Sequence, residues 1–331
     1  MKRIKRILRK FSFLRWLKAS RGVLPSFWTD LSRHFRYSLN YHYNYRNFPQ
    51  DAMRCFIMLL NHQLEKAQTY RAVKEGFGRE KLQQLLKLTE LYVDRYGTDD
   101  ITGATIGILE GHFTNPHAWK DETTYQRFLK LKENWPEERY HGGIIQYNGR
   151  KVKKISDLAD FLRNRRSCRT FAPEKVDEAL LLEAVKIAQS APSACNRQPV
   201  RVHLYSDPEQ IRKIIYAQHA DIEWCIHAPV LMIITANEYY YRDYLERHQK
   251  MFDAGLFSMT LNLILHNMGI GSCFKMAQKY PSYDRETKHY AEIPEYEDIC
   301  VLLLAGYYPE QSVATAKSSR ISIDKVCKIH Q

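Results

Sequence analysis

The stretch MFDAGLFSMTLNLILHNMG, residues 251–269, predicts one long helix with apolar side chains on nearly every side. A helix without a broad polar face has to be buried on most of its surface. Gly269 follows the last apolar residues, and glycine is a common residue at the end of a helix. We therefore expect residues 251–268 to form a helix that is covered by protein on most sides.

Buried strands are predicted on both sides of this helix along the chain. APVLMIITA (228–236) and DICVLLLAGYY (298–308) have the length of buried strands, and VRVHLY (200–205) alternates as a strand does. Two further helices are predicted over 154–164 and roughly 177–190. The chain from about residue 152 thus mixes helices with strands. It has no GxGxxG motif after a strand, which argues against an ordinary Rossmann dinucleotide site.

The preceding residues predict helices and loops. Residues 50–73 and 79–97 both show apolar residues at helical spacing, and glycines separate them, so we expect an antiparallel helix pair. Residues 100–150 have a helical and loop-like pattern. The aromatic stretch 24–50 predicts an irregular cover of packed side chains, although its tyrosines and histidines also suit stacking on bases or sugars. A chain of 331 residues is long enough for more than one domain.

The positive charge is concentrated at the start of the chain. The net charge is +13, and residues 1–22 hold nine lysines and arginines and no acidic residue, so the remaining 309 residues carry only about +4. Apolar residues recur at helical spacing between these cations, which predicts a basic amphipathic helix. Three interpretations stay open: a helix on an anionic membrane surface, a mitochondrial transit peptide, or a helix that packs on its own protein.

Composition favours an ordinary globular protein of the reducing cytosol. The chain is 44% hydrophobic and 26% charged, and no apolar run has the length of a transmembrane helix. The seven cysteines are scattered without a CxxC pair, so we expect mostly unpaired thiols. The histidines show no HExxH or similar spacing, so we predict no metal site. We expect a cytoplasmic protein, with peripheral membrane attachment through residues 1–22 as an open possibility.

Four stretches together suggest a site for a flat anionic ligand. RNRRSCRTFAPEKV (163–176) crowds arginines around Ser167, and guanidinium forks suit phosphate oxygens. SAPSACNRQP (190–199) offers amides with both donors and acceptors. MGIGSCFKMA (268–277) predicts a glycine-rich turn that lets backbone N–H groups approach a ligand. AKSSRISIDKV (316–326) returns two cations near the end of the chain.

In this order the stretches resemble the nitroreductase family of FMN-dependent enzymes, over roughly residues 152–331. The resemblance implies an α+β fold: an α/β/α sandwich with a mixed, mainly antiparallel sheet, here preceded by a mostly helical N-terminal region. The organisation we expect is a basic arm (1–22), a helical extension (23–150) and an FMN-binding domain (151–331). The family's homodimers hold two FMN sites at the interface, built from both chains, and helix 251–268 would be the central dimer helix.

The resemblance also assigns roles to individual residues. Arg165 and Ser167 match positions that hold the phosphate, ribityl chain or pyrimidine edge of the flavin, with Arg166 beside them, and Arg169 matches the cation near flavin N1 and O2. The remaining matches are Asn196 at the pyrimidine edge, Met276 and Ala277 with backbone N–H groups for N5 and O4, and Arg320, followed by Lys317, as a phosphate clamp. The amide of Gln198, with its donors and acceptor, suits the same heterocycle edge.

The implied activity is a ping-pong transfer of electrons from NAD(P)H through FMN to a small organic molecule, with no catalytic side chain. An alternative is a scaffold or membrane-associated binding protein that holds flavin with little turnover. Nucleic-acid binding through the basic arm finds no supporting domain, so we expect no nucleic-acid partner. The tyrosines of segment 237–251 either roof a substrate or pack at the surface. Cys168, Cys195 and Cys273 fit small buried side chains better than redox groups.

Overall fold

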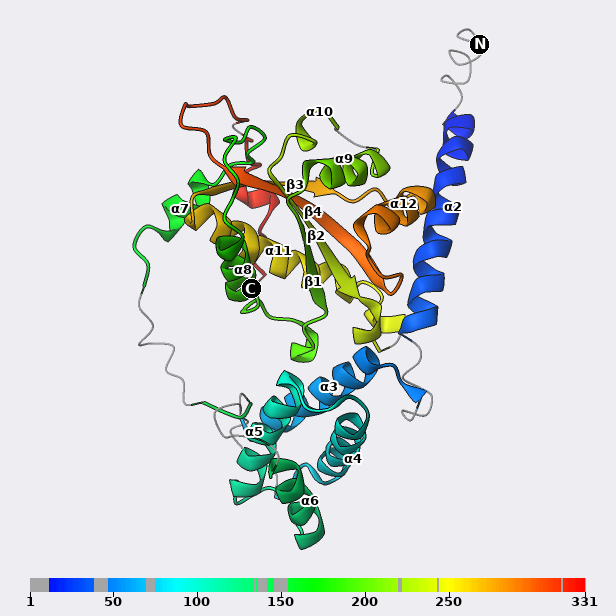
Figure 1. Cartoon of the computed structure of the whole chain (residues 1–331), viewed down its shortest axis with the longest axis vertical. Coiled ribbons are helices and arrows are strands. Elements are labelled where there is room, and N and C mark those ends of the chain that lie inside the picture. Colours follow the sequence, from blue (N-terminus) through cyan, green and yellow to red (C-terminus); the bar gives the residue numbers. More distant parts are fainter. Residues whose placement is uncertain are drawn as a thin grey trace.

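The structure is a computed structural model that describes residues 12–38, 47–69, 75–133, 135, 142–145, 154–219, 222–242, 244–316 and 318–330. Figure 1 shows three parts: a long N-terminal helix, a group of helices, and a sheet covered by helices on both faces. The predicted α+β fold with a helical N-terminal region is confirmed.

The sheet has four strands in the order β1-β2-β4-β3, and each pair of neighbours is antiparallel. The strands are β1 (Val200–Tyr205), β2 (Val230–Asn237), β3 (Ile270–Met276) and β4 (Glu297–Tyr307). All eight residues of β2 are buried, which is why its sequence is a continuous apolar run and not an alternating one. The long connections between the strands contain the helices that cover the two faces.

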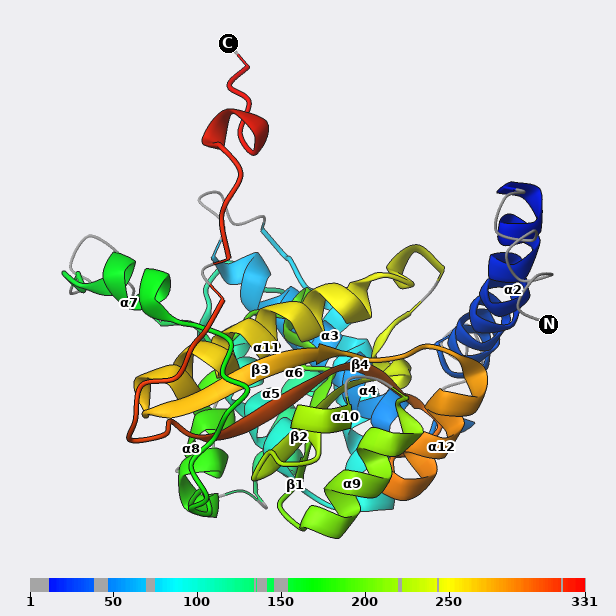
Figure 2. The ribbon, with the colours of Figure 1, turned by 90° about the horizontal axis from the view of Figure 1, so that it is seen from above.

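Alternate residues of β2 belong to two separate cores. Met232 and Ile234 pack with α8 (Glu178–Ala188) and α11 (Gln249–Asn267) on one face. Leu231 and Ile233 lie in the core of the other face. The helices of that face are α9 (Pro208–Ala217), α10 (Ile222–Cys225) and α12 (Pro281–Ala291). The result is a sheet between two helical layers, as Figure 2 shows from above.

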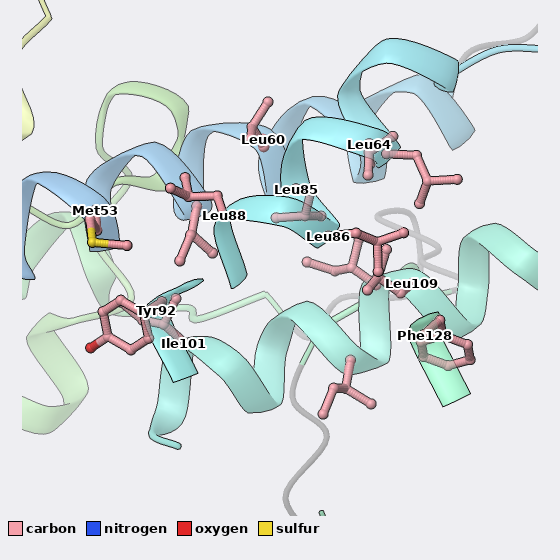
Figure 3. Packing of buried hydrophobic residues seen from close by; sticks show 14 of the residues in the cluster. Met53, Leu60, Leu64, Leu85, Leu86, Leu88, Tyr92, Ile101, Leu109 and Phe128 are labelled. Atoms are coloured by element: carbon pink, nitrogen blue, oxygen red, sulfur yellow. The ribbon is translucent and has the colours of Figure 1, made fainter. Parts of the chain in front are cut away.

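The helical extension has a core of its own. Its members are α3 (Gln50–Gln68), α4 (Arg79–Tyr96), α5 (Asp100–Thr114) and α6 (Glu122–Lys132). The predicted pair α3 and α4 packs through leucines at helical spacing, and α5 and α6 close the cluster with Leu109 and Phe128 (Figure 3). Asp99 and Thr102 form a capping box at the start of α5, which fixes where that helix begins.

The N-terminal helix α2 spans Ser12–Tyr37 and continues through Pro25. The predicted border between arm and extension at residue 22 therefore falls inside one helix. The prediction of an irregular aromatic cover is wrong as far as Tyr37, because that part of the stretch is helical. Residues 1–11 and 39–46 lie outside the described residues. None of the described helices combines the length and the apolar character needed to cross a bilayer.

A buried charge network joins α2 to the sheet. Arg33 of α2 contacts Asp298 of β4 at 2.9 Å and also pairs with Asp284 of α12. Lys250 lies 2.8 Å from the second oxygen of Asp298, and Lys279 contacts the first at 2.6 Å. Burial alone would raise the pKa of the Asp298 carboxyl, but Lys279, Lys250 and Arg33 hold that pKa well below its ordinary value.

Candidate functional site

The arginine-rich segment begins beside the edge strand β3, where Ser167 forms a parallel bridge with Ser272, and then crosses toward β4. It follows helix α7 (Leu158–Asn164). The Cys168 N–H donates to the carbonyl of Ser272 in β3 at 3.0 Å, and the Ala172 N–H donates to the carbonyl of Tyr307 in β4 at 3.0 Å. The segment therefore crosses from β3 to β4, and residues 165–169 are fixed at one end of the sheet.

Two paired glycines make this crossing possible. Gly271 of β3 lies opposite Gly306 of β4. A Cβ at Gly271 would come within 2.8 Å of the Cys168 side chain, and a Cβ at Gly306 would come within 2.8 Å of the Phe171 ring. The predicted glycine-rich turn over 268–277 is wrong beyond Gly269, because Gly271 belongs to strand β3, which the arginine segment crosses closely.

The arginines of this segment are not neutralised by acidic side chains. Among the described residues, no carboxylate lies within ion-pair distance of Arg165, Arg166 or Arg169. Arg169 lies over the Trp224 ring at 5.7 Å, and Arg166 donates to the backbone carbonyls of its own segment. Arg166 and Arg169 are exposed, while Arg165 is half-buried. This arrangement leaves positive charge available to an anion.

Strand β3 supplies the neighbours of these arginines. Burial raises the pKa of the Cys273 thiol, while the charges of Arg169 and Arg165 and a hydrogen bond from Ser167 act in the opposite direction. The thiol thus stays protonated, as expected of a small buried side chain. Met276 ends β3 with an exposed side chain, and Ala277 after it is buried. Ser167, Arg165 and Arg169 therefore lie beside β3, the strand that Met276 ends.

The C-terminal tail leads away from this region. Every described side chain from Gln311 to His330 is exposed, and Figure 2 shows the end of the chain projecting from the body. Arg320 makes a hydrogen bond to the backbone carbonyl of Ser318 in the tail. Lys317 lies outside the described residues. Within one chain, the structure thus does not bring Arg320 to the arginine segment.

A strained loop before β1 carries Asn196 and Gln198. Both residues have positive φ values, 51° and 52°, which are uncommon for residues other than glycine. Arg197 between them is fully buried, and its guanidinium donates to both carboxylate oxygens of Glu246 at 2.9 Å. Sequence reasoning missed this anchor, since nothing local to Arg197 indicates a buried ion pair with a residue 49 positions away.

Asn196 and Gln198 line a cleft of about 900 Å³ between the helical extension and the sheet domain. We call it the interdomain cleft. Its walls come from α3 and α5 on one side, and from the end of α8, the Asn196 loop and β1 on the other. Arg201 of β1 lies over the Tyr240 ring and donates to its hydroxyl at 3.1 Å. The cleft therefore has one wall from each part of the chain, and its lining combines polar and apolar side chains.

One buried group in this cleft has an unsatisfied hydrogen-bond acceptor. Asn61 of α3 is 5% exposed, and its Nδ2 donates to the Thr105 hydroxyl at 2.9 Å. That hydroxyl donates to the Ile101 carbonyl, so it must accept from Asn61, which fixes the orientation of the amide. Among the described residues, no donor reaches Asn61 Oδ1. A buried acceptor of this kind calls for a ligand or water that donates to it.

The arginine segment and the Asn196 loop thus lie at opposite ends of the sheet, and Met276 lies between them, opposite Val301 of β4. Val200 of β1 follows the Asn196 loop and lies opposite Ala236 of β2. Ala236 in turn lies opposite Asp298 near the start of β4. The arginine segment crosses β4 at Gly306 near its other end. The distance from Asp298 to Gly306 is about 27 Å at the rise of an extended strand. One chain does not bring the two groups together.

The tyrosines of segment 237–251 take different places. Tyr240 is buried and lines the interdomain cleft, and Tyr241 is buried under the Arg197 guanidinium at 5.9 Å. The Tyr239 ring packs against Tyr37 of α2 at 5.2 Å. The set therefore divides: Tyr240 lies at the wall of the cleft, while Tyr239 and Tyr241 pack against α2 and the Asn196 loop.

Comparison with known proteins places a family match on part of this site. The sequence model of the nitroreductase family matches residues 162–223, which include the arginine segment and the Asn196 loop. No curated protein matched the sequence.

Solved structures with a similar arrangement include three nitroreductase-like proteins. An FMN-dependent nitroreductase from Clostridium difficile is 19% identical, covers 52% of this chain and 98% of its own, and gives a TM-score of 0.45. A nitroreductase-like protein from Bacillus cereus is 19% identical, with coverages of 54% and 99% and a TM-score of 0.45. A nitroreductase family protein from Streptococcus pneumoniae is 19% identical, with coverages of 52% and 100% and a TM-score of 0.46.

Proposed function

We propose that this chain, whose residues 162–223 match the nitroreductase family, is an FMN-dependent oxidoreductase. It would pass electrons in a ping-pong scheme from NAD(P)H to a small organic acceptor. The observation that carries the proposal is the arginine segment, which is held across the sheet and has no carboxylate partner among the described residues. A phosphate of about −1.5 to −2 charge is a suitable ligand for such a cluster.

The side chains beside β3 fit this group. Arg165 and Ser167 would hold its polar edge, and Arg169 would place a positive charge near flavin N1 and O2. FMN supplies hydride and electron transfer when it is bound, and a cation near N1 favours the reduced, more negative form. The crossing at Gly271 and Gly306 packs the segment that carries these arginines closely against β3 and β4, which would orient its backbone before the ligand arrives.

A homodimer would explain why the site residues are divided. In a dimer built as the family's are, the arginine segment of one chain and the Asn196 loop of the other would face the same flavin. Helix α11 supports this arrangement: Leu261 and Leu265 are buried against the sheet, but Phe252 and Met259 on its other side are 61% and 44% exposed. The exposed tail, with four apolar residues from Ile321 to Ile329, suits contact with a second chain.

We expect Phe252→Glu combined with Met259→Glu to convert the dimer into a monomer, because two buried carboxylates per helix would face their copies across the interface. Light scattering measures the mass, and the wild-type chain should give twice 39.2 kDa. Glu substitutions at Leu182 and Ile187, exposed on α8, are the matched control and should leave the mass unchanged. A wild-type protein that is a flavin-loaded monomer would contradict the dimer.

We place the small-molecule acceptor in the interdomain cleft. Its volume of about 900 Å³ lies in the range of small-molecule sites, and Asn196, Gln198 and Arg201 supply polar groups on its walls. The test of the proposed function as a whole is the visible spectrum of the purified protein with FMN and NAD(P)H.

A further inference from the structure

Helix α2 presents an apolar stripe to solvent. Leu24, Phe27, Trp28, Leu31 and Phe35 follow one another at helical spacing on one face, and we call them the α2 stripe. Their side chains are between 50% and 71% exposed. An amphipathic helix of a globular protein usually turns this face toward the core. Five large apolar side chains gathered on one exposed helix face indicate an interaction surface.

The opposite, polar face of α2 is the one that is buried. Arg33 and His34 are 6% and 5% exposed. Arg33 is fixed by Asp284 and Asp298, and His34 Nδ1 lies 3.3 Å from Glu238. The buried charge network therefore holds α2 by its polar side and keeps the α2 stripe outward. Figures 1 and 2 both show α2 at the periphery of the molecule.

Charge decides which partner suits this surface. Asp30 is the single acidic residue in the α2 sequence, and it lies half-buried near the charge network. The helix continues a segment in which residues 1–22 carry nine lysines and arginines and no acid. A second copy would bring two strongly basic helices together and is disfavoured by repulsion. An anionic surface is favoured by about 1 kcal/mol for each cation that reaches it.

We propose that α2 attaches the protein to anionic phospholipid membranes, with the α2 stripe inserted at the interface. The helix lies in the plane of the surface, its leucines and phenylalanines enter the acyl boundary, and Trp28 sits at the level of the headgroups. The membrane contact thus includes residues 24–35 and is not confined to the basic arm. This inference does not depend on flavin binding.

The test is co-sedimentation of the full-length protein with lipid vesicles. The vesicles contain phosphatidylcholine alone or with about one third phosphatidylglycerol. We expect binding to the anionic vesicles at low salt and its loss at high salt. Phe27→Ser combined with Leu31→Ser should weaken binding by about tenfold or more, because two large apolar groups no longer leave water. Leu182→Ser combined with Ile187→Ser, two exposed residues of α8, is the matched control and should bind like wild type.

A second readout uses the tryptophan of the stripe. Brominated lipid should quench the tryptophan fluorescence of the bound protein, and Trp28→Phe should remove a large share of that quenching. Failure to bind anionic vesicles at low salt would overturn the proposal, as would equal binding of the Phe27→Ser/Leu31→Ser variant. Self-association that this variant abolishes, without vesicle binding, would assign the stripe to a second copy. Salt-sensitive capture of an acidic protein alone would assign it to a protein partner.

Discussion

Replacing Arg33 with methionine should destabilise the protein by about 3–5 kcal/mol, the usual cost of removing one partner from a buried ion pair. Arg33 contacts Asp284 and Asp298, and both of these carboxylates are buried. Methionine keeps much of the volume but leaves the network one positive charge short. Urea unfolding followed by circular dichroism measures the change in free energy.

The matched control for this prediction is an exposed ion pair. Arg212 contacts Glu209 at 2.5 Å on the surface of α9, and Arg212→Met should cost no more than about 1 kcal/mol. Equal costs for the two variants would mean that the buried charge network does not hold α2 to the sheet. A loss of stability that is large only for Arg33→Met would support the role of Arg33 in holding α2 to the sheet.

The Arg33 effect should also depend on pH. The pKa of the Asp298 carboxyl is depressed in the folded protein. The pairing of this carboxylate therefore stabilises the fold at pH values above about 3.9, the pKa of an aspartate in the unfolded chain. That stability is lost as pH falls below this value, because the unfolded chain then takes up a proton that folded Asp298 does not. Because Arg33 supplies part of the depression, the difference between wild type and Arg33→Met should be full at neutral pH and shrink below about pH 4.

The second large effect is expected on flavin affinity. Arg165→Ala should weaken FMN binding by about 1.5–3 kcal/mol, the value of a hydrogen bond to a charged group, or roughly 10- to 150-fold in Kd. The reason is that Arg165 is half-buried beside β3 and has no carboxylate partner among the described residues. Fluorescence titration of the apoprotein with FMN measures the constant.

Arg163, two residues earlier, provides the comparison for that variant. Its side chain is 76% exposed at the end of α7 and pairs with Asp160 at 3.4 Å. Arg163→Ala should leave the FMN affinity within about twofold of wild type. If Arg163→Ala and Arg165→Ala weaken FMN equally, then general positive charge and not a built site attracts the ligand.

The elements that could be predicted from the sequence are those whose burial is visible as a run of apolar residues. β2, β4 and α11 are continuous apolar runs, and the structure places them within a few residues of the predicted bounds. β3 was not predicted, because Gly269 and Gly271 indicate a turn when the crossing segment is not known. The second half of α2 was missed because it combines an internal proline with an apolar stripe that faces solvent, so the usual signals of a buried helix are absent.

The candidate site is less accessible to sequence reasoning. Its arginines and amides were found as motifs, but their division between two ends of the sheet follows from strand register, which no local pattern encodes. Arg197 and Asn61 owe their importance to partners far along the chain, Glu246 and Thr105. The interdomain cleft exists only because the helical extension packs beside β1, and that arrangement depends on tertiary contacts.

The most direct test of the proposed flavin chemistry is the absorption spectrum of the purified full-length protein, recorded under anaerobic conditions before and after NADH or NADPH. We expect the visible bands of an oxidised flavin, either as purified or after addition of FMN, and heat-released cofactor that is FMN and not FAD. The bands should bleach when the nicotinamide is added and return with an electron acceptor. A protein that stays colourless in excess FMN, or a bound flavin that neither nicotinamide reduces, would contradict the account.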